Sequence, residues 1–325
     1  RGRDLASGLP DERLERRQRW GARAGEQVAA QLERAELWPD LPHEAASGLA
    51  ILVTPADGLL LHLPFGVVEQ VIVDRTFATR QLFEGIARNP RHRVLVLDGH
   101  RARMYEGQGR LLAEVVDHGF PVHVEPPHEQ DSPHRDRPIH EEAEKEEHRI
   151  VYRAVDEALG ALGRPDPLPV VVTAVERELA RFEEVTSHDD LIAGRLLGNH
   201  AHAGTAELAG AVRPVLDAHR AAERGRVVER LREAHGRDRA VFGLHAVKEA
   251  AEEGRGHLLV VEEGFTFPRQ WVDGLAPGEG PDEQLDFDDV VDDVIETVLL
   301  AGGSVEFVDD GALSEGGHVG MLLRY

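Results

Sequence analysis

Val94-Leu95-Val96-Leu97-Asp98-Gly99 decides the fold, because a short apolar run that ends in Asp-Gly is typical of a strand entering a tight turn. Residues 101–106 and 111–117 have the same strand-like character. The sequence therefore predicts a meander of three consecutive strands that begins at residue 93.

Helices and further strands are predicted after this meander. Residues 139–162 form a long charged helix, because apolar residues recur there at helical spacing. The apolar run at 168–173 indicates a buried strand, and a helix follows over 174–184. Residues 191–202 are predicted as another strand and 205–234 as another helix.

Similar alternation is predicted on both sides of this central part. The sequence indicates an amphipathic helix over 11–37, short strands over 48–54, 59–64 and 67–77, and a helix over 78–88 that ends at Asn89-Pro90. Later come helices over 240–254 and 288–301 and strands over 257–262, 304–309 and 319–325. We expect an α/β (α+β) chain of three consecutive α/β domains, 1–90, 91–222 and 223–325.

Composition limits the function. The 325 residues include no cysteine, which excludes disulfides and thiolate zinc sites. The net charge of −23 argues against unspecific RNA affinity, although residues 75–103 are locally basic. No stretch reaches the roughly 20 apolar residues of a membrane span. We expect a soluble, cytoplasmic protein without membrane contact or cofactor, because residues 1–10 lack a signal-peptide pattern. The sequence starts at Arg1 without methionine, so we expect its native amino terminus to be missing.

The order of elements in the last third carries a resemblance to a known family. It resembles the carboxy-terminal domain shared by archaeo-eukaryotic release factors and Pelota, which is related to ribosomal proteins that bind RNA kink-turns. The residues that carry it are 241–251, 257–262, 301–303, 305–308 and the closing 320–325. The central part resembles the central domain of the same superfamily through 94–99 and 144–152. The chain thus resembles the bacterial branch of this superfamily, with its Balon-like relatives.

The resemblance implies a catalytic loop that this sequence does not have. In release factors a Gly-Gly-Gln loop precedes the long helix of the central domain and promotes hydrolysis of peptidyl-tRNA. Glycines let the backbone approach the ester and place an amide against the developing oxyanion, which prolines cannot do. Here residues 126–138 contain prolines and no Gly-Gly-Gln. Gln130 lies in this loop without glycine neighbours, and Gln108 lies between glycines in a different turn.

Two functions follow from this departure. The first is a ribosome-associated translation factor that does not hydrolyse peptidyl-tRNA and acts in rescue, stress or hibernation. The alternative is a peptidyl-tRNA hydrolase with a diverged loop, in which Gln130 positions the water. The resemblance further implies ribosomal RNA as a partner and a translational GTPase for the third domain, and we expect a monomer.

Basic residues at two places are candidates for contact with ribosomal RNA. Arginines and histidines bind phosphates, although they can equally be solvated side chains. The candidates in the loop are His134, Arg135 and Arg137, and the candidates in the first hairpin of the central part, predicted to form one basic patch, are Arg91, Arg93, Arg101 and Arg103.

Several histidines and aspartates are further candidates for metal ligands. A third function, an RNA-binding protein or metal-dependent nuclease, would use the histidine-rich loop, but His140 fails the HExxH spacing because Glu144 stands one turn later. His200 and His202 would share one face of the predicted strand, as ligands or as a structural pair. The aspartates at 286–293 lack the spacing of a calcium loop and are better explained by a helix amino terminus.

Overall fold

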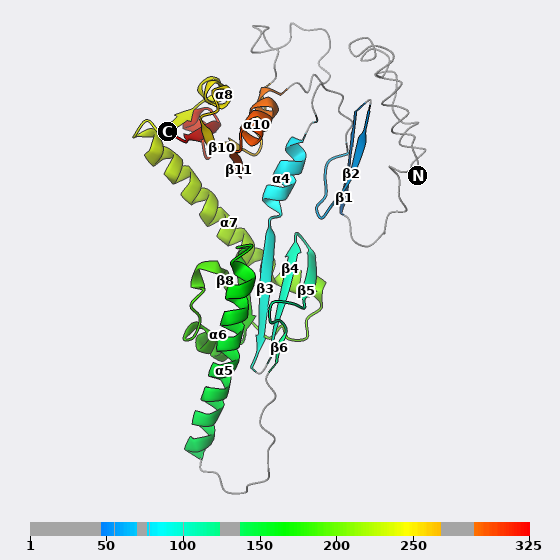
Figure 1. The fold of residues 1–325 in the computed structure, drawn as a ribbon, viewed down its shortest axis with the longest axis vertical. Helices are drawn as coiled ribbons and strands as arrows, with labels where there is room; N and C mark the ends of the chain where they lie inside the picture. The colour runs from blue at the N-terminus through cyan, green and yellow to red at the C-terminus, as the bar shows by residue number, and fades with distance from the viewer. Residues whose placement is uncertain are drawn as a thin grey trace. The chain divides into compact units, whose positions relative to one another are not determined.

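The structure is a computed structural model that describes residues 47–54, 56–69, 77, 79–99, 101–123, 137–267 and 289–325, with side chains in 137–147 excepted. The chain is a mixed α/β protein (Figure 1). It forms two compact units, one of Asn89–Glu223 and one that joins Arg1–Arg88 to Arg224–Tyr325. The division into three domains stays a prediction. The predicted helix over 11–37 lies outside the described residues.

The sheet of the Asn89–Glu223 unit contains the predicted meander. Its strands are β3 (Arg91–Asp98), β4 (Arg101–Gln108), β5 (Leu111–Val115), β6 (Val122–His123), β7 (Val170–Ala174) and β8 (Ile192–Leu197). Their order is β5-β4-β3-β7-β8, with β6 paired to β4. The meander strands are antiparallel, whereas β3, β7 and β8 run parallel, so the carboxyl ends of these three lie at one edge.

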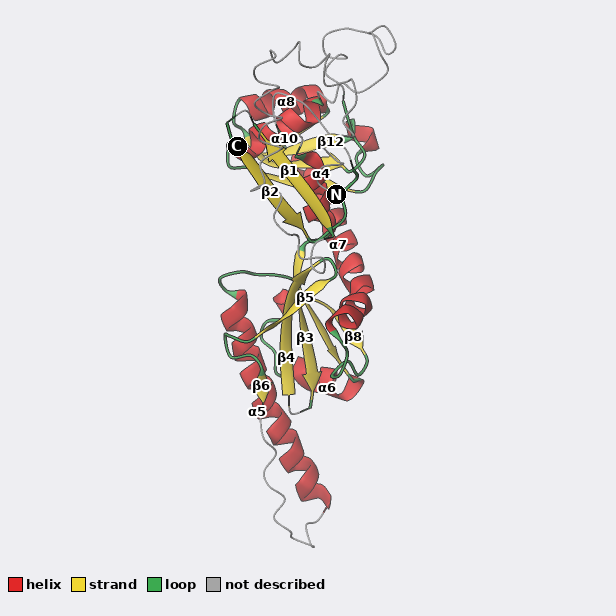
Figure 2. Cartoon of the chain, turned by 90° about the vertical axis from the view of Figure 1, so that its right-hand side faces the viewer, coloured by secondary structure: helices red, strands yellow, loops and turns green. Residues whose placement is uncertain are grey.

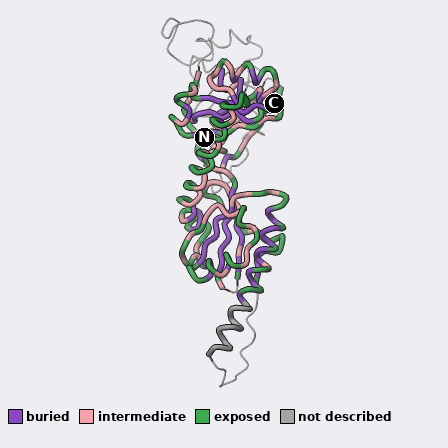
Figure 3. Tube along the Cα trace, turned by 90° about the vertical axis from the view of Figure 1, so that its left-hand side faces the viewer, coloured by how far each residue is buried: buried purple, intermediate pink, exposed green. Residues whose placement is uncertain are grey.

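Helices cover both faces of this sheet. On one face, α5 (Arg137–Gly163) and α6 (Glu176–Glu183) pack on apolar side chains of β3, β4 and β7. On the other face lies the first part of α7 (Thr205–His235), through Leu208 and Val212. Figure 3 shows the buried residues concentrated in the strands and along one side of α5. The sheet is therefore a buried central layer, as the continuous apolar runs predicted.

Helix α5 is longer than the sheet that it covers. Figures 1 and 2 show its first half projecting beyond the carboxyl end of β3. Residues 137–147 would extend the helix by roughly 16 Å at 1.5 Å per residue. His148 is the first α5 residue whose burial is described, and it is buried. The helix thus forms an arm whose base is held by the domain.

The second unit contains a four-stranded sheet in the order β11-β10-β12-β9. Its elements are β9 (Ala240–Phe242), α8 (Leu244–Glu252), β10 (Gly256–Glu262), α10 (Val290–Leu300), β11 (Ser304–Val308) and β12 (Val319–Leu323). Helices α8 and α10 pack on one face, and the last turns of α7 on the other. The prediction of one helix over 240–254 was wrong at its start, because residues 240–242 pair with β12 and Gly243, at φ 82°, separates strand from helix.

Two further pieces belong to this unit. Strands β1 (Gly48–Val53) and β2 (Gly58–Leu63) form an antiparallel hairpin. Helix α4 (Arg80–Arg88) packs Phe83 and Ala87 on the core of the four-stranded sheet. Residues 66–69 lie outside any strand, so the predicted strand over 67–77 does not begin there.

The described aspartates of this region lie at the amino terminus of helix α10, as the sequence predicted. Asp289 is the N-cap, and its side chain accepts a hydrogen bond from the Val291 amide at 3.0 Å. Asp292 and Asp293 occupy the first turn, while 286–288 lie outside the described residues. No helix in the described ranges is both long and apolar enough to cross a membrane.

Candidate functional site

A buried polar network holds the base of the α5 arm. Tyr152 donates its hydroxyl hydrogen to Oε2 of Glu178 in α6, and His148 Nδ1 lies 3.3 Å from the same oxygen. His148 Nδ1 also lies 3.2 Å from the carbonyl oxygen of Gly99, at the turn after β3. Both neighbours are acceptors, so Nδ1 carries the proton. The network therefore connects α5, α6 and the carboxyl end of β3.

Glu178 is the centre of this network and is held as a carboxylate. Its other oxygen accepts from Arg177 at 3.1 Å and Arg181 at 3.3 Å. Burial opposes ionisation of Glu178, but the hydrogen bond from Tyr152 and the neighbouring cations outweigh it and lower the pKa of Glu178. Burial, together with this hydrogen bond, raises the pKa of Tyr152, which remains the donor. A fixed charge with several donors is a rigid anchor.

The residues predicted to act in the loop before α5 fall outside the part of the chain whose side chains are described. Gln130, His134 and Arg135 lie outside the described residues, and Arg137 is the first residue of α5 with its side chain not described. Their roles stay predictions.

The four hairpin arginines do not form one patch, which corrects the prediction. In the register of β3 and β4, Arg93 faces Glu106, and Val96 faces Arg103. Because side chains alternate along a strand, Arg91 and Arg93 lie on the α5 face and Arg101 and Arg103 on the α7 face. Arg103 donates to the carbonyl of Ala201 and lies over the Tyr105 ring.

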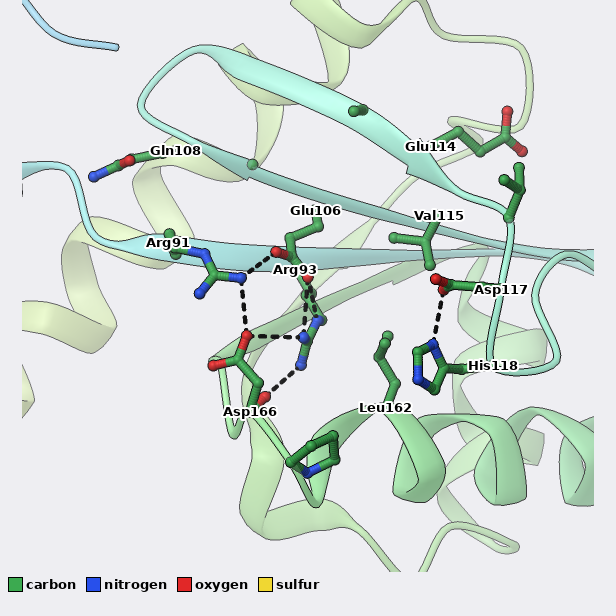
Figure 4. A pocket seen from close by; sticks show the side chains of 14 residues that line it. Arg91, Arg93, Glu106, Gln108, Glu114, Val115, Asp117, His118, Leu162 and Asp166 are labelled. Atoms are coloured by element: carbon green, nitrogen blue, oxygen red, sulfur yellow. Dashed lines mark hydrogen bonds and ion pairs between the residues drawn. The ribbon is translucent and has the colours of Figure 1, made fainter. Parts of the chain in front are cut away.

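Arg91 and Arg93 belong to a cluster of two arginines and two carboxylates (Figure 4). Buried Arg93 donates to Glu106 at 2.9 Å and to the carbonyl of Asp166 at 2.7 Å. Arg91, half-exposed, bonds Glu106 and lies 2.8 Å from Asp166 Oδ2. The hydrogen bond that Arg91 donates to Glu106 raises the pKa of Arg91. Burial opposes ionisation of Glu106, but the two arginines outweigh it and lower the pKa of Glu106.

This cluster forms one wall of an open cavity of about 640 Å³ on the α5 face. The ends of β3, β4 and β5 and the last turn of α5 surround it (Figure 4). Gln108, which the sequence placed in a glycine turn, lines this cavity rather than the arm.

The predicted histidine pair does not sit on a strand. Strand β8 ends at Leu197, so His200 and His202 lie in the following loop. His200 Nδ1 is 2.8 Å from the hydroxyl of buried Thr173, whereas His202 is exposed. In the parts of the chain that the structure describes, no group of three histidine or carboxylate side chains could hold a metal ion.

Asp156, Ser187 and His188 resemble a hydrolytic triad in composition but not in geometry. Ser187 donates to Asp156 Oδ2 at 2.7 Å, and His188 Nδ1 lies 3.0 Å from Oδ1. In a triad the second imidazole nitrogen contacts the serine, whereas here the serine approaches the same Nδ1, at 3.4 Å. Hydrogen bonds from Thr186 and Ser187 show that Asp156 fixes the turn after α6. Sequence reasoning missed both this contact and Glu178, because no local pattern marks the partners.

Comparisons with known proteins agree with the fold. The model of the family "Bacterial archaeo-eukaryotic release factor family 3" matches residues 91–255. A chain of a model of ribosome-bound archaeal Pelota and ABCE1 is similar with a TM-score of 0.50 and 16% identity, over 82% of this chain and 72% of its own. No curated protein matches the chain.

Two other solved structures are similar at lower scores. Archaeoglobus fulgidus Pelota has 16% identity and a TM-score of 0.36, over 76% of this chain and 68% of its own. Dom34 of S. cerevisiae, described as a translation termination-like factor, has 10% identity and a TM-score of 0.43, over 72% and 63%.

Proposed function

Because the chain belongs to bacterial archaeo-eukaryotic release factor family 3, we propose that it is a ribosome-associated translation factor that does not hydrolyse peptidyl-tRNA. The observation that carries this is the α5 arm, which projects from the sheet and is anchored at its base by Glu178. A rigid helix is suited to carry a loop away from the domain. The proposal includes three α/β domains, a role in rescue, stress or hibernation, and a monomer in the cytoplasm.

The chemistry of the loop supports binding over hydrolysis. Residues 124–136 connect β6 to α5, where the superfamily carries Gly-Gly-Gln, and they contain Pro126, Pro127 and Pro133 instead. Proline fixes φ and has no amide hydrogen, so it cannot supply the backbone donor that stabilises an oxyanion. The family resemblance extends the proposal to a translational GTPase as the partner of the carboxy-terminal part.

Ribosome binding should depend on the basic residues of the arm. With a net charge of −23, attraction to RNA has to be local, and Arg135 and Arg137 are the arginines closest in sequence to the start of α5. The double change of Arg135→Glu and Arg137→Glu is expected to weaken cosedimentation with ribosomes about tenfold. The matched control is Arg110→Glu with Arg237→Glu, two exposed arginines with the same change in net charge. Equal loss in both double variants would contradict a role of the arm.

Peptide release is the measurement that separates the two hypotheses. We expect stalled ribosomal complexes to keep their nascent peptide when the protein is added, and Gln130→Ala to change nothing, because Gln130 lacks the glycine neighbours that position a backbone amide. Release that Gln130→Ala abolishes would instead establish the diverged hydrolase.

A further inference from the structure

The cavity on the α5 face has two ends of different chemistry (Figure 4). At one end stand Arg91 and Gln108, which are direct cross-strand partners and therefore neighbours on the same face. At the other end Asp117 and His118 bond each other at 2.8 Å. Val115 and Leu162 line the space between the ends. The cavity thus combines apolar walls with polar groups at its ends, as ligand sites commonly do.

The charges of the cavity do not favour a phosphate. Arg91 and Arg93 carry two positive charges, which Glu106 and Asp166 neutralise at the distances given above. Asp117 adds a further carboxylate at the opposite end. Glu114 also lines the cavity, so a phosphate would meet more negative than positive charge, and the attraction that basic patches give to RNA backbones is missing here.

Hydrogen-bonding groups nevertheless remain available. Arg91 uses only one terminal nitrogen for both of its ion pairs, so Nε and the other terminal nitrogen have no partner among the described residues. The amide of Gln108 likewise has no hydrogen bond to any residue that the structure describes. Arg91 and Gln108, at adjacent positions, together offer several N–H donors and one acceptor, which are the kinds of group that pair with the edge of a nucleobase.

We propose that this cavity binds an unpaired RNA base, with Arg91 and Gln108 at its hydrogen-bonding edge and the apolar walls against its ring. Single-stranded and bulged RNA is recognised in this way, through bases turned out of the helix rather than through phosphates. This inference rests on the proposed function, since it supplies that function with a second RNA contact distinct from the arm.

The proposal predicts that RNA binding depends on the presence and identity of the base. The full chain is titrated into fluorescently labelled eight-nucleotide RNAs of each base and into an abasic strand of the same length, with anisotropy as the readout. We expect at least one base to bind about tenfold or more tightly than the abasic strand. Gln108→Leu, at a half-exposed position without a described partner, should remove that difference, and unlabelled nucleosides in competition show whether the base alone suffices.

A matched variant separates the effect of losing a cavity residue from the effect of losing a positive charge elsewhere. Arg91→Met should reduce base-dependent binding, whereas Arg110→Met, which removes an exposed arginine in the β4–β5 turn, should preserve it. Equal binding of abasic and base-containing RNA, or unchanged base dependence in Gln108→Leu, overturns the proposal. If ribosome cosedimentation fails while base dependence persists, the proposed function falls and the cavity stands. If ribosome cosedimentation persists while base dependence is absent, only the proposal for the cavity falls.

Discussion

Glu178→Gln is expected to lower the free energy of unfolding of the Asn89–Glu223 unit by about 3 kcal/mol, because a buried carboxylate loses its charge while its donors stay in place. A glutamine has one acceptor oxygen where Glu178 has two, so its amide nitrogen would face either Tyr152 and His148 or the two arginines. Tyr152 and His148 cannot turn to water instead, because both are buried. Hydrogen exchange of the amides in β7 and the second half of α5 measures the change within this unit.

The same variant should change the dependence on pH. The folded-state pKa of Glu178 lies below its ordinary value of 4.5, so its contribution is present above that pH and is lost as the pH falls through the lowered pKa. Protection in the wild type should therefore decrease below about pH 4.5, and Glu178→Gln should flatten that part of the profile.

Glu183→Gln is the matched control, because Glu183 lies on the same helix, is exposed and pairs with Arg195 at the surface. Surface pairs contribute roughly 0–1 kcal/mol. If the two variants lose the same small amount, Glu178 does not anchor the arm. If Glu178→Gln loses stability and ribosome binding while the control retains both, the base of the arm matters for function.

The central meander shows which parts of the fold follow from local sequence. Val94 to Leu97 is continuously apolar because both faces of β3 are covered, and Asp98-Gly99 forms the turn where the strand ends. The apolar residues that recur at helical spacing in α5 include Val151 and Val155, which are buried as this spacing predicts, although Ile150 is exposed. Local pattern and tertiary burial agree in these elements.

Register and long-range contacts could not be predicted in the same way. Within each strand the two arginines share one face, as predicted. The turn between β3 and β4 decides which face of the sheet each pair occupies, and a register shift of one residue would move a pair to the opposite face. Glu178 is separated from His148 by a strand and two turns, so no spacing identifies the pair. Strand β9 is three residues long and is determined by its pairing with β12. Each failure concerns a contact between elements rather than the element itself.

Asp292→Asn is expected to stabilise the unit that contains α4 and α10. Burial raises the pKa of Asp292 to about 7, and the neighbouring carboxylates of Asp289, Asp293 and Glu84 add to this against the opposing charge of Arg80. Asp292 Oδ1 is buried and has no hydrogen-bond partner among the described residues. Asp289, in contrast, accepts hydrogen bonds from the amides of Val291 and Phe267 and from Arg80.

The direction of the pH effect follows from the raised pKa of Asp292. The unfolded chain releases the proton of Asp292 near pH 3.8, whereas the folded chain keeps it to about pH 7. Stability therefore decreases as the pH rises between these values and is constant above them. After allowance for partial exposure, we expect Asp292→Asn to raise the free energy of unfolding by about 2 kcal/mol at pH 8 and to change little at pH 4.

Denaturation at pH 4, 6 and 8, with hydrogen exchange of β10 to assign the unit, tests this expectation. Glu296→Gln is the control, because Glu296 lies on the exposed side of α10 and should alter stability equally little at each pH. The favourable field of the helix amino terminus acts on Asp292 in the opposite sense, since it stabilises carboxylates in the first turn. A loss of stability in Asp292→Asn at pH 8 would mean that this field outweighs burial and the like charges of Asp289 and Glu84.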